Sequence, residues 1–121
     1  MPLIESFEEM LSWKRARKLN SIIYTETNSA MFAKDYALKD QIRKSSISIM
    51  SNIAEGFERS SNKEFKYFMN VAKGSAGELR SQLYIAKDLN YIDEDVFKQC
   101  YEQIVKISEL ISGFINSLNK A

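Results

Sequence analysis

The residues of this chain best suited to chemistry form a short cationic cluster near its start. The cluster lies within the stretch WKRARK and consists of Lys14, Arg15, Arg17 and Lys18, next to Trp13. Ammonium and guanidinium groups bind phosphates through charge-assisted hydrogen bonds, and an indole can stack on a nucleobase. The cluster therefore predicts a nucleic-acid site. The alternative is a solvated helix face whose cations neutralise the acidic stretch ESFEE that precedes it.

Two more cations, Arg43 and Lys44, occur further along the chain. They extend the cluster into one cationic patch only if the fold places the two segments side by side. Any such patch has to be local, because 17 Lys and Arg against 16 Asp and Glu leave a net charge of only +1. A chain that binds nucleic acid over much of its surface usually carries a basic excess.

The sequence lacks the residues that most catalytic and metal sites require. Without any His, the chain has no imidazole base, no Ser-His-Asp arrangement and no His metal ligand. One Cys cannot build a structural zinc site, and no glycine-rich phosphate loop occurs. Carboxylate chemistry by Glu55 and Glu58 stays open, and it predicts a metal ion or substrate held between helices. We expect no enzymatic activity, no cofactor, no bound metal and no small-molecule substrate.

Size and composition bound the architecture and the compartment. With 121 residues, of which 45% are hydrophobic, the chain is long enough for one domain over residues 1–121. A single Cys suits a reducing compartment. No apolar run approaches the roughly 18 to 20 residues that cross a bilayer. We therefore expect a cytoplasmic protein with no membrane partner.

Apolar residues recur at helical spacing along most of the chain, and one Pro and four Gly leave little to interrupt helices. The pattern predicts helices at about residues 12–28, 35–57, 62–89 and 93–118. Joints this short leave successive helices antiparallel, so we expect an all-α, up-down-up-down four-helix bundle. Cys100 lies on the apolar stripe of the last helix and is interpreted as a core residue rather than a reactive thiol.

Polar residues at the expected helix starts indicate where each helix begins. Ser61 with Glu64 three residues on is a capping-box pair, and Asp93 precedes an acidic first turn. The first helix has two alternatives, a cap at Ser12 or a cap at Ser6, and we favour Ser12.

Two faces of the predicted helices look unlike ordinary solvated surface. In the helix at 62–89, the side opposite the apolar stripe carries Asn70, Gly74, Gly77 and Ser81. A Gly in a helix interior costs about 1 kcal/mol relative to Ala, so we expect another body to approach closely there. The alternative is that a strongly amphipathic helix simply tolerates these residues.

A second polar line, which includes Ser48, Asn52 and Glu55, flanks the apolar face of the helix at 35–57. Short neutral side chains outnumber charged ones on it, so we interpret the line as hydrogen-bonding groups against another helix or another protomer. The two faces together predict a homo-oligomer. Gly56, near the end of the same helix, is expected where a bulkier side chain would obstruct the turn.

The block Ser51–Gly56, within SNIAEGFERSSNKEF, and the earlier LSWKRARKL carry a family resemblance that extends over nearly the whole chain. The sequence closely resembles small bacterial four-helix-bundle proteins related to those encoded by intervening sequences in 23S ribosomal RNA genes. That family also looks related to the accessory protein of diversity-generating retroelements, which forms a ring-like pentamer of such bundles and works with nucleic acid. The resemblance implies a four-helix bundle that assembles into a homopentameric ring.

The sequence departs from the family pattern at two places. Met50 stands where the family commonly has Pro, which leaves open whether the helix is kinked there. Phe32-Ala33 stands where the family often has Phe-Pro, so a looser turn is expected before the helix at 35–57.

From these observations we expect a non-enzymatic homo-oligomer that binds structured RNA or a ribonucleoprotein through the cationic patch. Repetition of a modest patch around a ring would multiply weak contacts by effective concentration. The alternative is a protein-interaction scaffold with no nucleic-acid role, whose neutral helix faces recruit a protein partner.

Overall fold

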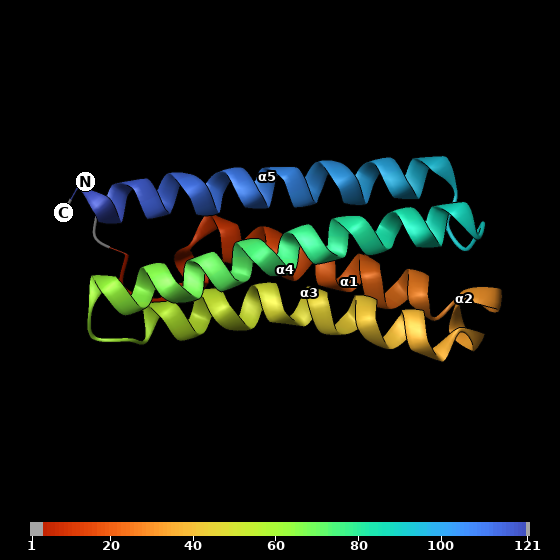
Figure 1. The fold of residues 1–121 in the computed structure, drawn as a ribbon, viewed down its shortest axis with the longest axis horizontal. Helices are drawn as coiled ribbons and strands as arrows, with labels where there is room; N and C mark the ends of the chain where they lie inside the picture. The colour runs from red at the N-terminus through yellow and green to blue at the C-terminus, as the bar shows by residue number, and fades with distance from the viewer. Residues whose placement is uncertain (1–3, 121) are drawn as a thin grey trace.

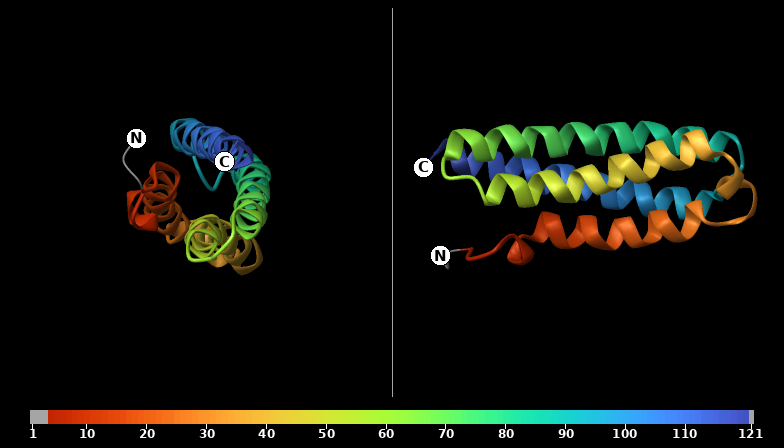
Figure 2. Two further views of the ribbon diagram at one scale, coloured as in Figure 1. Left: turned by 90° about the vertical axis from the view of Figure 1, so that its left-hand side faces the viewer. Right: turned by 90° about the horizontal axis from the view of Figure 1, so that it is seen from below.

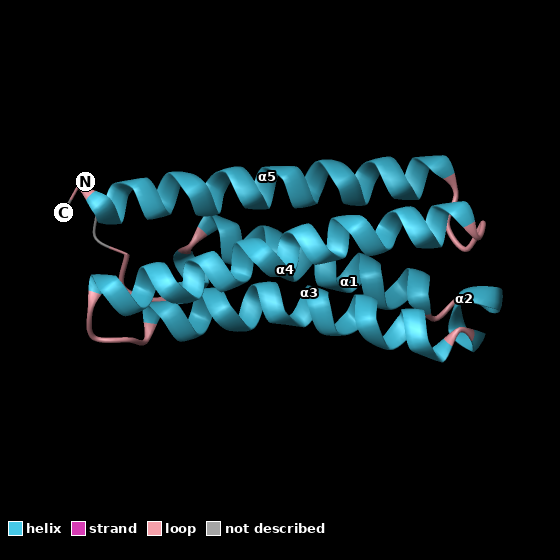
Figure 3. Cartoon of the chain, viewed as in Figure 1, coloured by secondary structure: helices cyan, strands magenta, loops and turns pink. Residues whose placement is uncertain are grey.

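The computed structural model describes residues 4–120, and within that range every regular element is helical (Figure 3). A short 3-10 helix, η1 (Phe7–Glu9), comes first. The α-helices that follow are α1 (Leu11–Thr27), α2 (Ala30–Lys34), α3 (Tyr36–Phe57), α4 (Asn62–Asp88) and α5 (Glu94–Asn119). The four long helices lie at the ranges that the apolar spacing predicts, and α2 adds one short helical turn.

The four long helices run up, down, up and down beside one another (Figure 1). Seen end-on, they follow the order α1, α3, α4, α5 around the core, and α5 also contacts α1 (Figure 2). The short joints leave successive helices antiparallel, and each helix buries its apolar stripe against the helices on either side of it. The predicted all-α, up-down-up-down four-helix bundle is confirmed.

The core is built from the apolar stripes of the long helices. Its fully buried residues are mostly aliphatic and include Leu19, Ile23, Ile42, Ile49, Ile53, Met69, Leu79, Ile104, Ile107 and Ile111. Cys100 belongs to the same cluster with 1% of its surface exposed. Burial away from water, with a smaller contribution from the charge of Glu26, raises the pKa of this thiol to about 11. The interpretation of Cys100 as a core residue is confirmed.

Two of the predicted helix caps are present. The Ser61 hydroxyl accepts a hydrogen bond from the Glu64 amide at 3.2 Å, and the Asp93 carboxylate accepts one from the Val96 amide at 2.8 Å. Each satisfies an amide that has no partner within its own helix. The Glu64 carboxylate departs from the capping-box pattern, because it accepts from the Ser61 hydroxyl and from Arg59 instead of the Ser61 amide.

The expected cap at Ser12 is wrong. Helix α1 begins at Leu11 with Met10 as its N-cap, and Ser12 is a buried residue of the first turn. The open alternative, Ser6, caps η1 instead, where the Glu9 carboxylate accepts from the Ser6 amide at 3.1 Å. The physical reason is that Met10 packs into the core, with 3% exposed, so burial of this side chain fixes where α1 starts.

The joint between α1 and α3 is held by packing. Phe32 of α2 is 2% exposed, and its ring stacks on that of Tyr91 with centroids 5.1 Å apart. The Tyr91 hydroxyl donates to Asp35 at 3.0 Å, and the same carboxylate caps α3 by accepting from the Leu38 amide at 3.1 Å. Helix α3 then continues as α-helix through Met50 to its end.

Candidate nucleic-acid interface

Three of the four cations in the WKRARK stretch share one side of α1. Lys14, Arg17 and Lys18 are exposed, and they line a surface depression of about 430 Å³ together with Glu8, Trp13 and Ser21. The guanidinium carbon of Arg17 lies 5.7 Å from the centroid of the Trp13 ring, within the range of a cation–π contact. These three cations are accessible to a phosphate-bearing partner.

Arg15 lies apart from the other three. Its guanidinium points toward α5, where Nη1 donates to the Gln103 side chain at 3.4 Å. Its Nε is buried and has no hydrogen-bond partner among residues 4–120. Successive helical residues are 100° apart, so adjacent cations point in different directions around α1.

The fold brings Arg43 and Lys44 next to α1. The guanidinium carbon of Arg43 lies 4.3 Å from the centroid of the Tyr24 ring, and its Nε donates to the Thr27 hydroxyl at 2.8 Å. Lys44 is exposed. With Tyr24, the two cations line a shallow depression of about 520 Å³, whose other lining residues are Asp40, Ile47 and Ser48.

The depression beside Tyr24 lies where α1 meets α3, whereas the depression beside Trp13 is lined by residues of η1 and α1. Trp13, Arg17 and Tyr24 are spaced at i, i+4 and i+11, so they share one line along α1. Between them, Asn20 accepts a hydrogen bond from the Ser46 hydroxyl of α3 at 2.9 Å, which shows that this line faces α3. We call it the α1–α3 edge. Arg17 and Arg43 lie on this edge, Lys14, Lys18 and Lys44 lie beside it on the exposed surface, and Arg15 points away from it.

The cations of the α1–α3 edge form no ion pair with a described carboxylate, although Glu8 and Asp40 line the same two depressions. The ion pairs found among residues 4–120 are Arg59–Glu55, Arg59–Glu64 and Lys87–Glu94, and none involves the cationic patch. In the acidic stretch before α1, the Glu9 carboxylate accepts from the backbone amides of Glu5 and Ser6 at 2.7 and 3.1 Å. Glu8 of the same stretch lines the depression of Lys14, Arg17 and Lys18 without forming an ion pair with them, so a solvated face beside the acidic stretch stays the alternative interpretation.

The small residues of α4 form part of the outer surface of the bundle. Asn70, Gly74 and Ser81 are exposed, and Gly77 is half-buried. A Cβ added at Gly74 or Gly77 would meet no atom of the described residues within 4 Å. The close approach predicted for these glycines is therefore absent within the bundle, so an approaching body would have to be a second molecule. Tyr67, on the same side of α4, is 63% exposed.

The polar line of α3 makes its hydrogen bonds within the chain. The hydroxyls of Ser48 and Ser75 are 2.8 Å apart across the α3–α4 contact, and the Asn52 amide donates to the Ser48 hydroxyl at 3.0 Å. Glu55 accepts from Arg59 at 3.3 Å. Of the two partners that the sequence left open for this line, another helix or another protomer, the structure shows the helix for Ser48.

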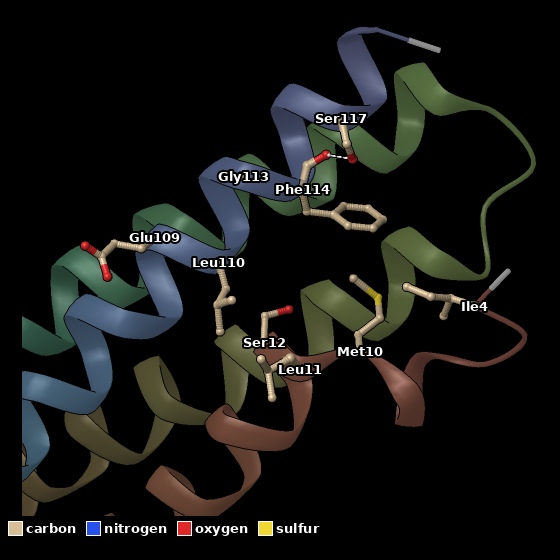
Figure 4. A pocket seen from close by; sticks show the side chains of 9 residues that line it. All are labelled: Ile4, Met10, Leu11, Ser12, Glu109, Leu110, Gly113, Phe114 and Ser117. Carbon is tan, nitrogen blue, oxygen red and sulfur yellow. Dashed lines mark hydrogen bonds between the residues drawn. The ribbon is translucent and has the colours of Figure 1, made fainter. Parts of the chain in front are cut away.

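Sequence reasoning missed an apolar cleft between the start of α1 and the second half of α5. It has a volume of about 400 Å³ and is lined by Ile4, Met10, Leu11, Ser12, Glu109, Leu110, Gly113, Phe114 and Ser117 (Figure 4). Figure 4 shows Leu110 and Phe114 reaching toward the first turn of α1. Little in the sequence indicates this cleft. Leu11 lies before the predicted start of the first helix, and Gly113 does not interrupt the apolar stripe of the last helix.

Two further observations concern metal or carboxylate sites and membrane-spanning helices. No group of three or more metal-binding side chains gathers within residues 4–120, and Glu58, the partner proposed for Glu55, is exposed at the end of α3. No helix of the described chain is long and apolar enough to cross a membrane.

Comparison with known proteins places this arrangement in a family. A solved structure from Bacteroides thetaiotaomicron, described as a protein with unknown function from the S23 ribosomal protein family, has a TM-score of 0.74 and 23% identity to this chain. The match covers 86% of this chain and 94% of that chain, which shows the shared fold. No curated protein matches the chain. The family model described as "23S rRNA-intervening sequence protein" matches residues 8–113, and the chain therefore belongs to this family.

Proposed function

We propose that this chain is a non-enzymatic protein that assembles into a homo-oligomer and binds structured RNA, free or within a ribonucleoprotein, through the α1–α3 edge. The observation that carries the proposal is a set of cations without carboxylate partners. Lys14, Arg17 and Lys18 of α1 and Arg43 and Lys44 of α3 lie on or beside this edge, and none forms an ion pair with a described residue. Cations that are not paired within the protein can bind phosphates at little electrostatic cost.

Assembly into a homo-oligomer would enlarge the small basic surface that a single bundle offers. With a net charge of +1, one chain offers only a small basic surface. Several copies on one RNA would raise the affinity through effective concentration, without any new contact. The outer side of α4, with Gly74 and Gly77 open and Tyr67 63% exposed, is the proposed contact between copies. By family resemblance, the proposed assembly is a pentamer.

The experiment for RNA binding is a salt series on a structured RNA, with affinity measured by fluorescence anisotropy. We expect affinity to fall steeply as salt rises, because each phosphate contact releases counterions. Replacement of Lys14, Arg17 and Lys18 together by Gln is expected to abolish binding and flatten the salt dependence. A matched control replaces Lys98, Lys106 and Lys120, exposed cations of α5 and its C-cap, by Gln. Absence of binding at low salt would overturn the proposal.

The alternative function is a protein-interaction scaffold with no nucleic-acid role. The observation that favours it is the same outer side of α4, where exposed Tyr67 and Ile85 flank the two glycines. An affinity pull-down from nuclease-treated lysate separates the two functions. One protein recovered in stoichiometric amount, with no RNA affinity for the purified chain, would support the scaffold.

A further inference from the structure

The α1–α3 edge holds two arginine side chains against aromatic rings. Arg43 of α3 lies over Tyr24, with its guanidinium carbon 4.3 Å from the ring centroid, and Arg17 of α1 lies over Trp13 at 5.7 Å. Trp13 and Tyr24 are eleven residues apart in α1, which corresponds to about 16 Å along the helix axis. The edge thus presents two aromatic-backed guanidinium groups on one line.

The guanidinium of Arg43 is fixed from two directions. Its Nε donates to the Thr27 hydroxyl at 2.8 Å, and its guanidinium carbon lies over the Tyr24 ring. Thr27 is itself fully buried, and its hydroxyl donates to the Ile23 carbonyl at 2.7 Å, which directs its lone pair at Arg43. A side chain held at both its Nε and its plane loses little further freedom when a partner binds it.

We propose that the RNA bound at this edge is recognised through unpaired bases, which stack on the guanidinium planes of Arg43 and Arg17. The inference rests on the proposed RNA binding and names the part of the RNA that is contacted. Guanidinium planes and aromatic rings bind the faces of bases, and these faces are covered inside a duplex. Bulges, internal loops and single-stranded ends expose them.

The surroundings of Arg43 fit a nucleotide. The depression beside it holds the ammonium group of Lys44 for a phosphate and the exposed side chain of Ile47 for apolar contact with a base or sugar. Lys14 and Lys18 stand beside Arg17 in the second depression. Each stacking plane therefore has a neighbouring cation, as a single-strand site that combines stacking with phosphate binding requires.

The test compares two RNA hairpins that differ at one point. One stem is fully paired, and the other carries a single unpaired 2-aminopurine nucleotide, whose fluorescence reports stacking. We expect the full-length protein to bind the bulged hairpin about tenfold more tightly than the paired one, which is the size of effect that one stacked base provides. Binding is also expected to change the 2-aminopurine fluorescence.

Matched substitutions separate the planar group from its charge. Arg43→Lys keeps the charge but removes the plane, so the preference for the bulged hairpin, measured as the ratio of the two affinities in the same variant, should fall to about one to three-fold. Tyr24→Phe keeps the ring and should preserve the preference, whereas Tyr24→Leu should reduce it. Circular dichroism melting of each variant confirms that the bundle is folded.

Each outcome distinguishes the inference from the proposed function. Equal affinities for the two hairpins, or an Arg43→Lys variant that retains the full preference, overturn base recognition and leave phosphate-based RNA binding standing. If neither hairpin binds at low salt, both the inference and the proposed function are overturned. A preference lost in Arg43→Lys and Tyr24→Leu and kept in Tyr24→Phe supports the inference.

Discussion

Gly56 lies at a point in the bundle where no side chain fits. A Cβ added there would lie 3.0 Å from a ring carbon of Phe65, 3.0 Å from the Cβ of Phe68 and 3.3 Å from the Phe65 carbonyl oxygen. These atoms belong to α4 just after the joint, so the end of α3 and the start of α4 are in direct contact. The glycine of the SNIAEG block therefore meets a steric requirement of the joint, as the sequence reading expected.

We predict opposite effects for alanine at two glycines. Gly56→Ala should lower the free energy of unfolding by about 1–3 kcal/mol, because the neighbouring atoms include backbone and cannot all move away. Gly113→Ala should raise it by roughly 0.5–1 kcal/mol, because its Cβ would meet nothing within 4 Å in the described chain and helix propensity improves. Urea unfolding monitored by circular dichroism measures both. A destabilised Gly113→Ala variant would contradict the reading of this site as open.

The Cys100 thiol provides a prediction about pH. Its pKa is raised to about 11 from an ordinary value of 9.0, chiefly because burial disfavours the thiolate. Below pH 9 the thiol is protonated in both the folded and unfolded states. As pH rises from about 9 to about 11, the unfolded chain releases this proton more readily than the folded one. The contribution of Cys100 to stability is therefore present below pH 9 and lost by about pH 11.

The measurement compares the free energy of unfolding of wild type and Cys100→Ala across this pH range. Wild type should lose more stability than the variant as pH rises, because other titrating groups are common to both. Parallel curves for the two proteins would show that the folded environment does not raise the pKa of the thiol.

At the scale of elements, Asp35 joins two parts of the bundle. Its carboxylate caps α3 through the Leu38 amide at 3.1 Å and accepts from the Tyr91 hydroxyl, which lies between α4 and α5, at 3.0 Å. The same contact raises the pKa of Tyr91, because the carboxylate accepts a hydrogen bond from the protonated phenol and its negative charge disfavours the phenolate. One side chain thus fixes where α3 begins and where the α4–α5 joint lies.

Asp35→Ala should cost about 1–2 kcal/mol of unfolding free energy, since it removes both a helix cap and the Tyr91 hydrogen bond. Tyr91→Phe removes only the second and serves as the matched control, with an expected loss smaller than that of Asp35→Ala. Thermal and urea unfolding of the two variants and of the double variant measure the coupling. Equal losses for Asp35→Ala and Tyr91→Phe would mean that the cap contributes nothing.

The cations of the WKRARK stretch in α1 point in different directions around the helix. Arg15 points to α5 and bonds with Gln103, whereas Arg17 lies on the side that faces α3. Lys14 and Lys18 are exposed to solvent. The functional consequence is that the accessible part of the patch is completed by Arg43 and Lys44 of α3 rather than by Arg15, its neighbour in the sequence.

At the scale of the whole molecule, the proposed assembly and the proposed RNA site lie on different surfaces. The assembly surface is the outer side of α4, and the RNA site is the α1–α3 edge, which lie apart when the bundle is seen end-on (Figure 2). Copies joined through α4 would leave Arg17 and Arg43 free, whereas Lys44 lies nearer α4 because it also lines a depression with Glu78. Assembly and RNA binding can therefore be separated by substitution.

We predict that Gly74→Glu combined with Gly77→Glu gives a folded chain that does not assemble, because two carboxylates would be buried against a second copy. Its affinity for structured RNA should fall by on the order of 100-fold as the gain from multiple sites is lost. Sedimentation across a salt series, with and without RNA, measures assembly and binding together. Gly113→Glu, which places one carboxylate on an open site of α5, is the control. An unassembled variant with unchanged RNA affinity would contradict the proposed role of assembly.

Much of the fold follows from patterns that are local in the sequence. The stripe from Phe97 to Ile111 specifies α5, and Ser61 and Asp93 specify where α4 and α5 begin, because caps and helical periodicity act over only a few residues. The start of α1 was predicted wrongly because it depends on the burial of Met10 in the core. The residues that bury Met10 are distant from it in the sequence. The apolar cleft beside Leu110 was missed for the same reason.

The sequence by itself determined the four helices, their antiparallel order and the supply of cations and glycines, since each depends on residue type and spacing along one chain segment. The tertiary structure alone decided which side chains meet. It placed Arg43 on Tyr24 and Thr27, turned Arg15 away to Gln103, and paired Ser48 with Ser75. These contacts depend on the relative rotation of packed helices, which is fixed only when all the apolar stripes are buried together.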